Sequence, residues 1–97
     1  HLPHIVAATL VNALASLDTP EEQMKTVAAG GFKDITRIAS SSPEVWQQIC
    51  LSNQKQLSNV LDSYIRLLVQ AKYLVDNKKG HELYNMFESS RKYRHYA

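Results

Sequence analysis

Apolar residues recur along this chain at intervals of three and four, which is the spacing of an amphipathic α-helix. The longest such segment covers residues 54–78, and its main apolar stripe consists of Leu57, Leu61, Tyr64, Leu68, Ala71 and Val75. A second stripe repeats every seven residues beside the first, at Val60, Leu67 and Leu74. One stripe needs one partner helix, so two adjacent stripes indicate contact with two or more. We therefore predict one long central helix over residues 54–78.

Helix-start and helix-stop signals divide the rest of the chain into shorter helices. Thr19 and Glu22 have the spacing of a capping box, and Ser42 before a proline is a second start signal. The pair Gly30-Gly31 is expected to end one helix, and Gly80 is expected to be the C-cap of the long one. We predict about six helices, near residues 3–17, 20–29, 32–39, 43–53, 54–78 and 81–95. Because no segment alternates apolar and polar residues as a strand does, the predicted fold class is all-α.

The composition is that of one ordinary globular domain. Apolar residues make up 44% and charged residues 21% of the 97 positions, and the net charge of +2 is too small to favour nucleic acid as a partner. The most apolar run, residues 5–15, is about half the ~20 residues that span a bilayer, so no membrane segment is expected. A lone Cys50 excludes an intramolecular disulfide and fits a reducing, cytoplasmic compartment. The chain begins at His1 rather than Met, so we expect a piece of a longer protein.

Two cations stand one helical turn apart in the segment GGFKDITRIA, residues 30–39. Lys33 and Arg37 at this spacing oppose helix formation by roughly a few tenths of a kcal/mol, and Asp34 offsets only part of that. One explanation is a surface ion pair between Arg37 and Asp34, which stabilises by at most about 1 kcal/mol. The other is that the Arg37 guanidinium binds a carboxylate of a ligand, for which its planar fork is suited. The pattern alone leaves both explanations open.

Four further side chains are candidates for chemistry, each with a structural alternative. His1 and His4 are three residues apart, a spacing compatible with a metal, but no other residues complete such a site, so we expect structural or surface roles and no metal. Trp46, the only tryptophan, is either a core anchor or part of a site. Cys50 lies among apolar residues and is expected to be a packed thiol. No recognisable nucleophile–base set occurs, so no catalytic residue is assigned to this chain.

The segments HLPH (residues 1–4) and GGFKDITRIASSSPEVWQQICLSN (residues 30–53), with the distance between them, resemble the C-terminal helical domain of prephenate dehydrogenase. The pattern G-F-[KR]-D-x-T-R-I-A, followed by W and I-x-x-x-N, is long and specific. It covers roughly the first half of the chain, and the second half is generic helix. The resemblance implies a domain over residues 1–97 that is similar to the helical C-terminal domains of 6-phosphogluconate-dehydrogenase-like enzymes and forms an interlocked homodimer.

The family's enzymes oxidatively decarboxylate prephenate to 4-hydroxyphenylpyruvate with NAD or NADP, in the biosynthesis of tyrosine. The resemblance implies that a Rossmann domain upstream binds the nucleotide and carries the catalytic histidine, so the 97 residues alone are expected to be inactive. It also implies that Arg37 binds a carboxylate of prephenate and that His1 and His4 lie near the substrate. Other motif positions would shape or border the same pocket: Gly30, Gly31, Lys33, Asp34 and Trp46.

Two alternatives remain open at the level of sequence. An arogenate dehydrogenase would share this domain, and the residues do not distinguish the two substrates. Outside the enzymes, a dimerisation or DNA-binding module could use residues 32–39 and 43–53 as a helix-turn-helix. The second of those helices has no Lys or Arg to contact phosphates, which disfavours DNA binding. The preference for NAD or NADP, feedback by tyrosine and a following ACT domain are not determined by the sequence.

Overall fold

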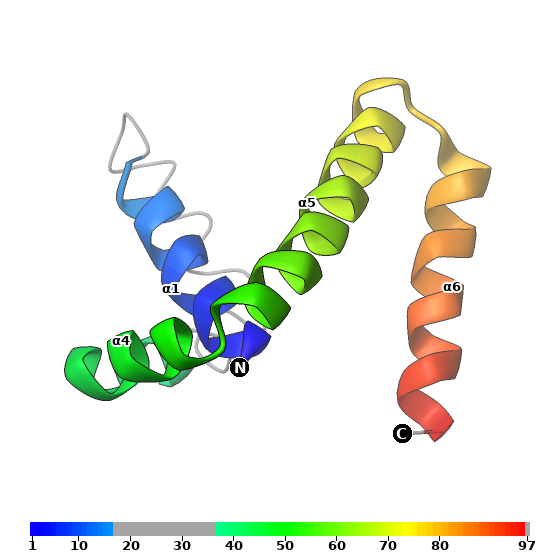
Figure 1. Ribbon diagram of the computed structural model, residues 1–97. Coiled ribbons are helices and arrows are strands. Elements are labelled where there is room, and N and C mark those ends of the chain that lie inside the picture. The colour runs from blue at the N-terminus through cyan, green and yellow to red at the C-terminus, as the bar shows by residue number, and fades with distance from the viewer. Residues whose placement is uncertain (17–36, 97) are drawn as a thin grey trace. The chain divides into compact units, whose positions relative to one another are not determined.

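The computed structural model describes residues 1–16 and 37–96, and within these ranges the chain forms helices and no strand (Figure 1). The α-helices are α1 (Leu2–Ala15), α4 (Pro43–Ser52), α5 (Gln54–Asp76) and α6 (Gly80–Tyr96), and η1 (Ile38–Ser40) is a 3-10 turn. The predicted all-α class is confirmed. The predicted helix at 20–29 and the start of the one at 32–39 lie outside the described residues, which hold the other four predicted α-helices.

Local sequence determines where α4 begins, as predicted. The Ser42 Oγ accepts a hydrogen bond from the Val45 N–H at 3.4 Å, and Pro43 occupies the first turn. The same hydroxyl donates to Glu44 Oε2 at 3.1 Å. Two hydrogen bonds lower the pKa of the Glu44 carboxyl: the larger effect comes from its own backbone N–H and the smaller from the Ser42 hydroxyl. The resulting carboxylate lies at the positive end of the helix dipole and therefore supports this start.

The turn between α5 and α6 differs from the expected one. Gly80 is not the C-cap of the long helix, because α5 ends at Asp76 and Gly80 is the first residue of α6. Lys78 takes the left-handed conformation instead, with a φ of 52°, and the Lys79 N–H donates to the Leu74 carbonyl oxygen at 2.9 Å. A β-carbon makes this conformation unfavourable by about 1 kcal/mol. The turn therefore carries backbone strain that the sequence pattern does not indicate.

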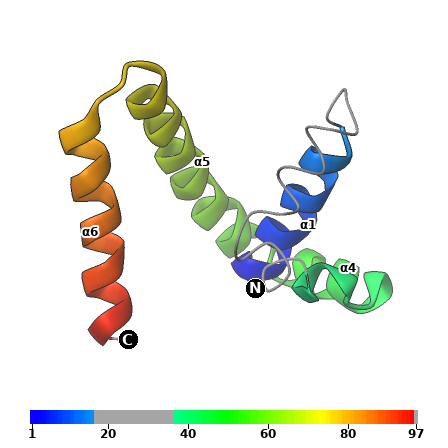
Figure 2. The same cartoon turned by 180° about the vertical axis from the view of Figure 1, so that it is seen from behind.

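The chain divides into two compact units, His1–Asn59 and Val60–Ala97. In the first unit α1 packs against η1, and Ala7 and Leu57 are buried. In the second unit α6 runs in the opposite direction to α5 (Figures 1 and 2), and Leu74 is buried. These three are the buried hydrophobic residues of the described part of the chain, whereas large apolar side chains of α5 are exposed: Val60, Ile65, Leu67, Leu68, Val69 and Val75. Within the described residues of one chain, much apolar surface of the long helix is therefore exposed.

Candidate functional site

A cavity of about 420 Å³ lies between α1 and α4, within the first compact unit. Each helix lines it with residues at helical spacing, so the lining residues share one side of that helix. They are His4, Ile5, Ala8 and Thr9 from α1, and Pro43, Trp46, Gln47 and Cys50 from α4, with Ile38, Ala39, Ser41 and Ser42 from η1 and the residues after it. The lining is mostly apolar. A cavity of this size and character suits a small molecule with one ring.

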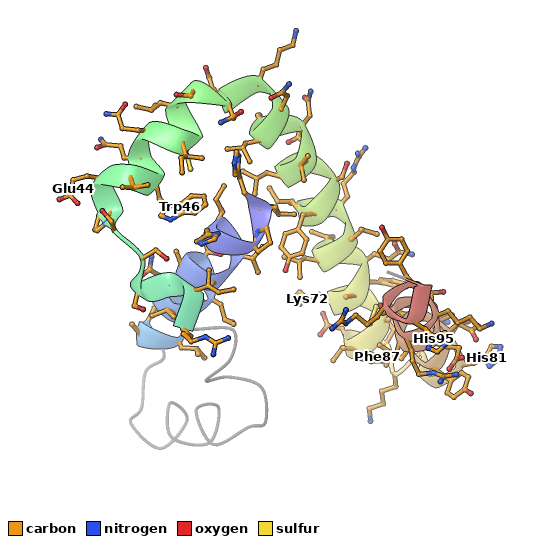
Figure 3. All side chains as sticks on the ribbon, turned by 90° about the horizontal axis from the view of Figure 1, so that it is seen from below. Glu44, Trp46, Lys72, His81, Phe87 and His95 are labelled. Carbon is orange, nitrogen blue, oxygen red and sulfur yellow. The ribbon has the colours of Figure 1, made fainter. Side chains whose placement is uncertain are left out.

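Aromatic contacts join the two helices at this cavity. The His4 and Trp46 rings are stacked, with centroids 3.6 Å apart and planes 19° apart. The His1 ring meets the same indole edge-on, with centroids 5.9 Å apart and an interplanar angle of 75°. Figure 3 shows the Trp46 side chain directed from α4 towards α1. The structure therefore brings three of the predicted site residues together, and the half-buried Trp46 forms a wall of the cavity.

Most of the hydroxyl groups in the lining bind the chain's own backbone. Thr9 Oγ1 donates to the carbonyl oxygens of Ile5 (2.9 Å) and Val6 (3.0 Å), and Ser41 Oγ donates to that of Ile38 (2.8 Å). The Ser42 hydroxyl is engaged in the α4 cap. These hydroxyl groups therefore stabilise the local backbone, and none of these hydrogen bonds orients a hydroxyl group towards a ligand.

Arg37 lies next to the cavity but does not line it. It directly precedes Ile38, has the helical angles φ −56° and ψ −36°, and is exposed. Its carbonyl oxygen accepts a hydrogen bond from Ser40 Oγ at 2.8 Å. Four other predicted site residues lie outside the described part of the chain, namely Gly30, Gly31, Lys33 and Asp34. The ion pair considered between Arg37 and Asp34 therefore lies outside the described residues.

Sequence reasoning missed the contribution of Gln47 and Cys50 to the cavity. Both share the side of α4 that carries Trp46, one and four positions further along the helix. That spacing would have predicted them once Trp46 was assigned to a cavity wall. Cys50 was expected to be a packed thiol, and it is a half-buried free thiol that also lines the cavity.

Neither a metal centre nor a membrane span is found in the part of the chain that the structure describes. Across residues 1–16 and 37–96, no three His, Cys, Asp or Glu side chains come together as ligands of one ion. None of the helices in those ranges combines the length and the apolar character that crossing a membrane requires.

Together these features define a helical domain with an apolar cavity and an uncovered helix face. The family described as "Prephenate dehydrogenase, dimerization domain" matches residues 1–89, and the chain belongs to this family. The resemblance inferred from the motifs is thereby confirmed.

Characterised relatives match along nearly the whole chain. It is 39% identical over 94 residues to the prephenate dehydrogenase of Bacillus subtilis, covering 97% of this chain and 25% of that protein. It is 34% identical over 95 residues to the cyclohexadienyl dehydrogenase of Zymomonas mobilis, covering 97% of this chain and 32% of that protein. The chain therefore spans between a quarter and a third of the length of these relatives.

Two solved structures have the same fold. Synechocystis arogenate dehydrogenase superposes with a TM-score of 0.87 at 28% identity, covering 97% of this chain and 34% of that one. The prephenate dehydrogenase of A. aeolicus, solved with hydroxyphenyl propionate and NAD+, superposes with a TM-score of 0.83 at 35% identity, covering 97% and 33%.

Proposed function

We propose that this chain is the dimerisation and substrate-binding domain of an NAD(P)-dependent dehydrogenase that converts prephenate to 4-hydroxyphenylpyruvate in tyrosine biosynthesis. The carrying observation is the cavity between α1 and α4, whose wall is the stacked His4–Trp46 pair from two of the family's motifs. Its apolar lining and size suit the six-membered ring of the substrate. The A. aeolicus relative binds hydroxyphenyl propionate, which is also a ring with a carboxylate-bearing tail, and this supports the assignment.

In this proposal Arg37 binds a substrate carboxylate. Prephenate carries two carboxylates, and a guanidinium binds such a group through two parallel hydrogen bonds. Arg37 is exposed and adjoins the cavity-lining Ile38, so a ligand whose ring lies in the cavity could present its carboxylate at the rim. Gly30, Gly31, Lys33 and Asp34 would border the same pocket, as the resemblance implies. No residue of this chain is given a role in abstracting the proton from the substrate hydroxyl.

The nucleotide is proposed to bind mainly to a Rossmann domain outside these 97 residues. A dinucleotide normally binds where a strand leads through a glycine-rich turn into a helix, and residues 1–16 and 37–96 contain no strand. None of the described residues is therefore assigned to the nucleotide. When bound, NAD or NADP would accept the hydride from the substrate carbon that bears the hydroxyl. This domain would contribute a wall that excludes water from the ring.

A homodimer is the proposed assembly, and the cytoplasm the proposed location. The family's description as a dimerization domain and the exposed apolar side chains of α5 support the dimer. Nucleic acid is not a proposed partner, because α4 has no Lys or Arg. The free thiol of Cys50 is compatible with a reducing compartment.

An arogenate dehydrogenase is the second candidate, and the similarity to the Synechocystis enzyme favours it specifically. The test of both is a turnover assay on the full-length protein, with prephenate and arogenate each supplied with NAD+ or NADP+. We expect nucleotide reduction with at least one substrate and none with the isolated 97-residue chain. Absence of turnover by a folded full-length protein with every combination would refute the proposed function.

A further inference from the structure

The polar side chains of the cavity divide into engaged and unengaged groups. The hydroxyls of Thr9, Ser41 and Ser42 are bound within their own helices or caps. The His4 ring is covered on one face by Trp46. The carboxamide of Gln47 makes no hydrogen bond to the described part of the chain, and the residue is exposed. Gln47 is therefore the lining residue with the most hydrogen-bonding capacity left for a ligand.

The position of Gln47 on α4 links it to the ring-binding wall. It follows Trp46 directly, and both line the same cavity although they are separated by about 100° around the helix. A ring lying against the Trp46 wall would leave its substituents near the neighbouring lining positions. Gln47 is thus placed to contact a substituent of the ring rather than the ring itself.

The chemistry of a carboxamide matches the difference between the two candidate substrates. Prephenate carries a 2-oxo group in its side chain, and arogenate carries a 2-ammonium group at the same position. An amide N–H can donate to a keto oxygen, and the amide oxygen can accept from an ammonium, so neutral glutamine accommodates both. A charged residue at this position would favour one substrate and oppose the other.

We propose that Gln47 contacts the 2-oxo or 2-ammonium group of the substrate, so that the charge of the side chain at this position decides whether one of the two substrates is preferred. This rests on the proposed function, because it takes the cavity to be the substrate site. Since glutamine serves both groups, the unmodified protein should use both substrates at comparable efficiency. Replacement by an anion or a cation should separate them in opposite directions.

The experiment compares Gln47→Glu and Gln47→Lys in the full-length protein, and measures kcat/KM for arogenate and for prephenate. The neighbouring Gln48 is also exposed and does not line the cavity, so Gln48→Glu and Gln48→Lys are matched controls for charge. We expect Gln47→Glu to raise the arogenate-to-prephenate ratio by about tenfold, which is about 1.4 kcal/mol, and Gln47→Lys to lower it. The Gln48 variants should leave the ratio unchanged.

The outcomes separate this inference from the proposed function. A ratio that stays within about twofold in both Gln47 variants, while the protein turns over either substrate, overturns the role of Gln47 alone. The same holds if the Gln48 variants shift the ratio equally, since that indicates a general charge effect. Wild-type protein that uses neither substrate overturns the proposed function, and this inference with it. If one Gln47 variant does not fold, the opposite-charge variant still gives the sign of the shift.

Discussion

Replacing Leu68 by aspartate tests whether the exposed face of α5 is a dimer interface. Leu68 belongs to the main apolar stripe of the long helix, and 50% of its surface remains exposed in the single chain. Leu67 on the adjacent stripe is exposed to 63%. Exposed apolar surface on neighbouring stripes of one helix is typical of a surface that a partner covers. In a symmetric dimer, each substitution changes the interface twice.

The expected weakening of the dimer follows from the exposed apolar surface of Leu68. Complete burial of a leucine side chain stabilises by about 1.5–3 kcal/mol, so covering the exposed half contributes roughly 1 kcal/mol per copy. A carboxylate in the same place adds a desolvation cost of several kcal/mol if it is buried. For the two copies the loss is at least about 4 kcal/mol, which corresponds to a dissociation constant about a thousandfold higher.

Sedimentation of the 97-residue chain at micromolar concentration, with circular dichroism on the same samples, measures the effect. We expect a helical dimer for the wild type and loss of both dimer and helix for Leu68→Asp. Helix should be lost as well because the described residues bury only Ala7, Leu57 and Leu74 within one chain. Gln70→Asp is the control, since it adds the same charge to an exposed polar position about 200° further around α5. A wild-type chain that is a folded monomer, or a Leu68→Asp variant that dimerises normally, would refute the reasoning.

Four further predictions concern the site and the turns. Arg37→Ala in the full-length protein should lower kcat/KM for prephenate, with a loss of transition-state stabilisation of about 2–4 kcal/mol, because a charge-assisted contact is removed. A change in kcat/KM within about twofold would favour a surface role for Arg37. Trp46 fluorescence should change on addition of hydroxyphenyl propionate to the full-length protein, and His4→Ala should reduce that change because it removes the stacked ring. Lys78→Gly should stabilise the chain by about 1 kcal/mol in denaturant unfolding, because it relieves a φ of 52°, whereas Lys79→Gly should not. The hydrogen bond from Arg91 lowers the pKa of the Glu88 carboxyl. The Glu88 carboxylate therefore contributes stability above its unfolded-state pKa, and this contribution is lost as the pH falls through its folded-state pKa. Glu88→Gln should therefore reduce the acid dependence of the free energy of unfolding measured below pH ~5.

Local signals predicted the α-helices of the described residues well because these signals depend on neighbouring residues only. Ser42 was correctly expected to cap α4, and the long helix ends at Asp76, two residues before its predicted end. The turn that follows was predicted less well, because glycine preference placed the left-handed residue at Gly80 whereas the chain places it at Lys78. Several backbone hydrogen bonds across the turn stabilise the left-handed conformation at Lys78, and the residue types of the turn do not reveal these bonds.

The residues of the candidate site could be predicted from the sequence only through the family resemblance. His4 and Trp46 are 42 positions apart, and no periodicity relates α1 to α4, so their stacking depends on how the two helices pack. Motif matching nevertheless selected both residues, and the structure brings their rings together. Gln47 was not selected, since a glutamine on a helix surface has no distinguishing pattern until its neighbour is known to line a cavity.

The apolar residues of α4 lie on two sides of the helix. One side of this helix carries Trp46, Gln47 and Cys50 and faces the cavity. Val45 and Ile49 are four residues apart and share another side, where Val45 is exposed to 52%. A helix with apolar residues on two sides is more stable when both are covered, and within the described residues Val45 remains exposed while Ile49 is half-buried. In the proposed enzyme, a partner surface over the Val45 side would stabilise the helix that carries Trp46, so we expect the proposed substrate binding to depend on the assembled enzyme rather than on the isolated 97-residue chain.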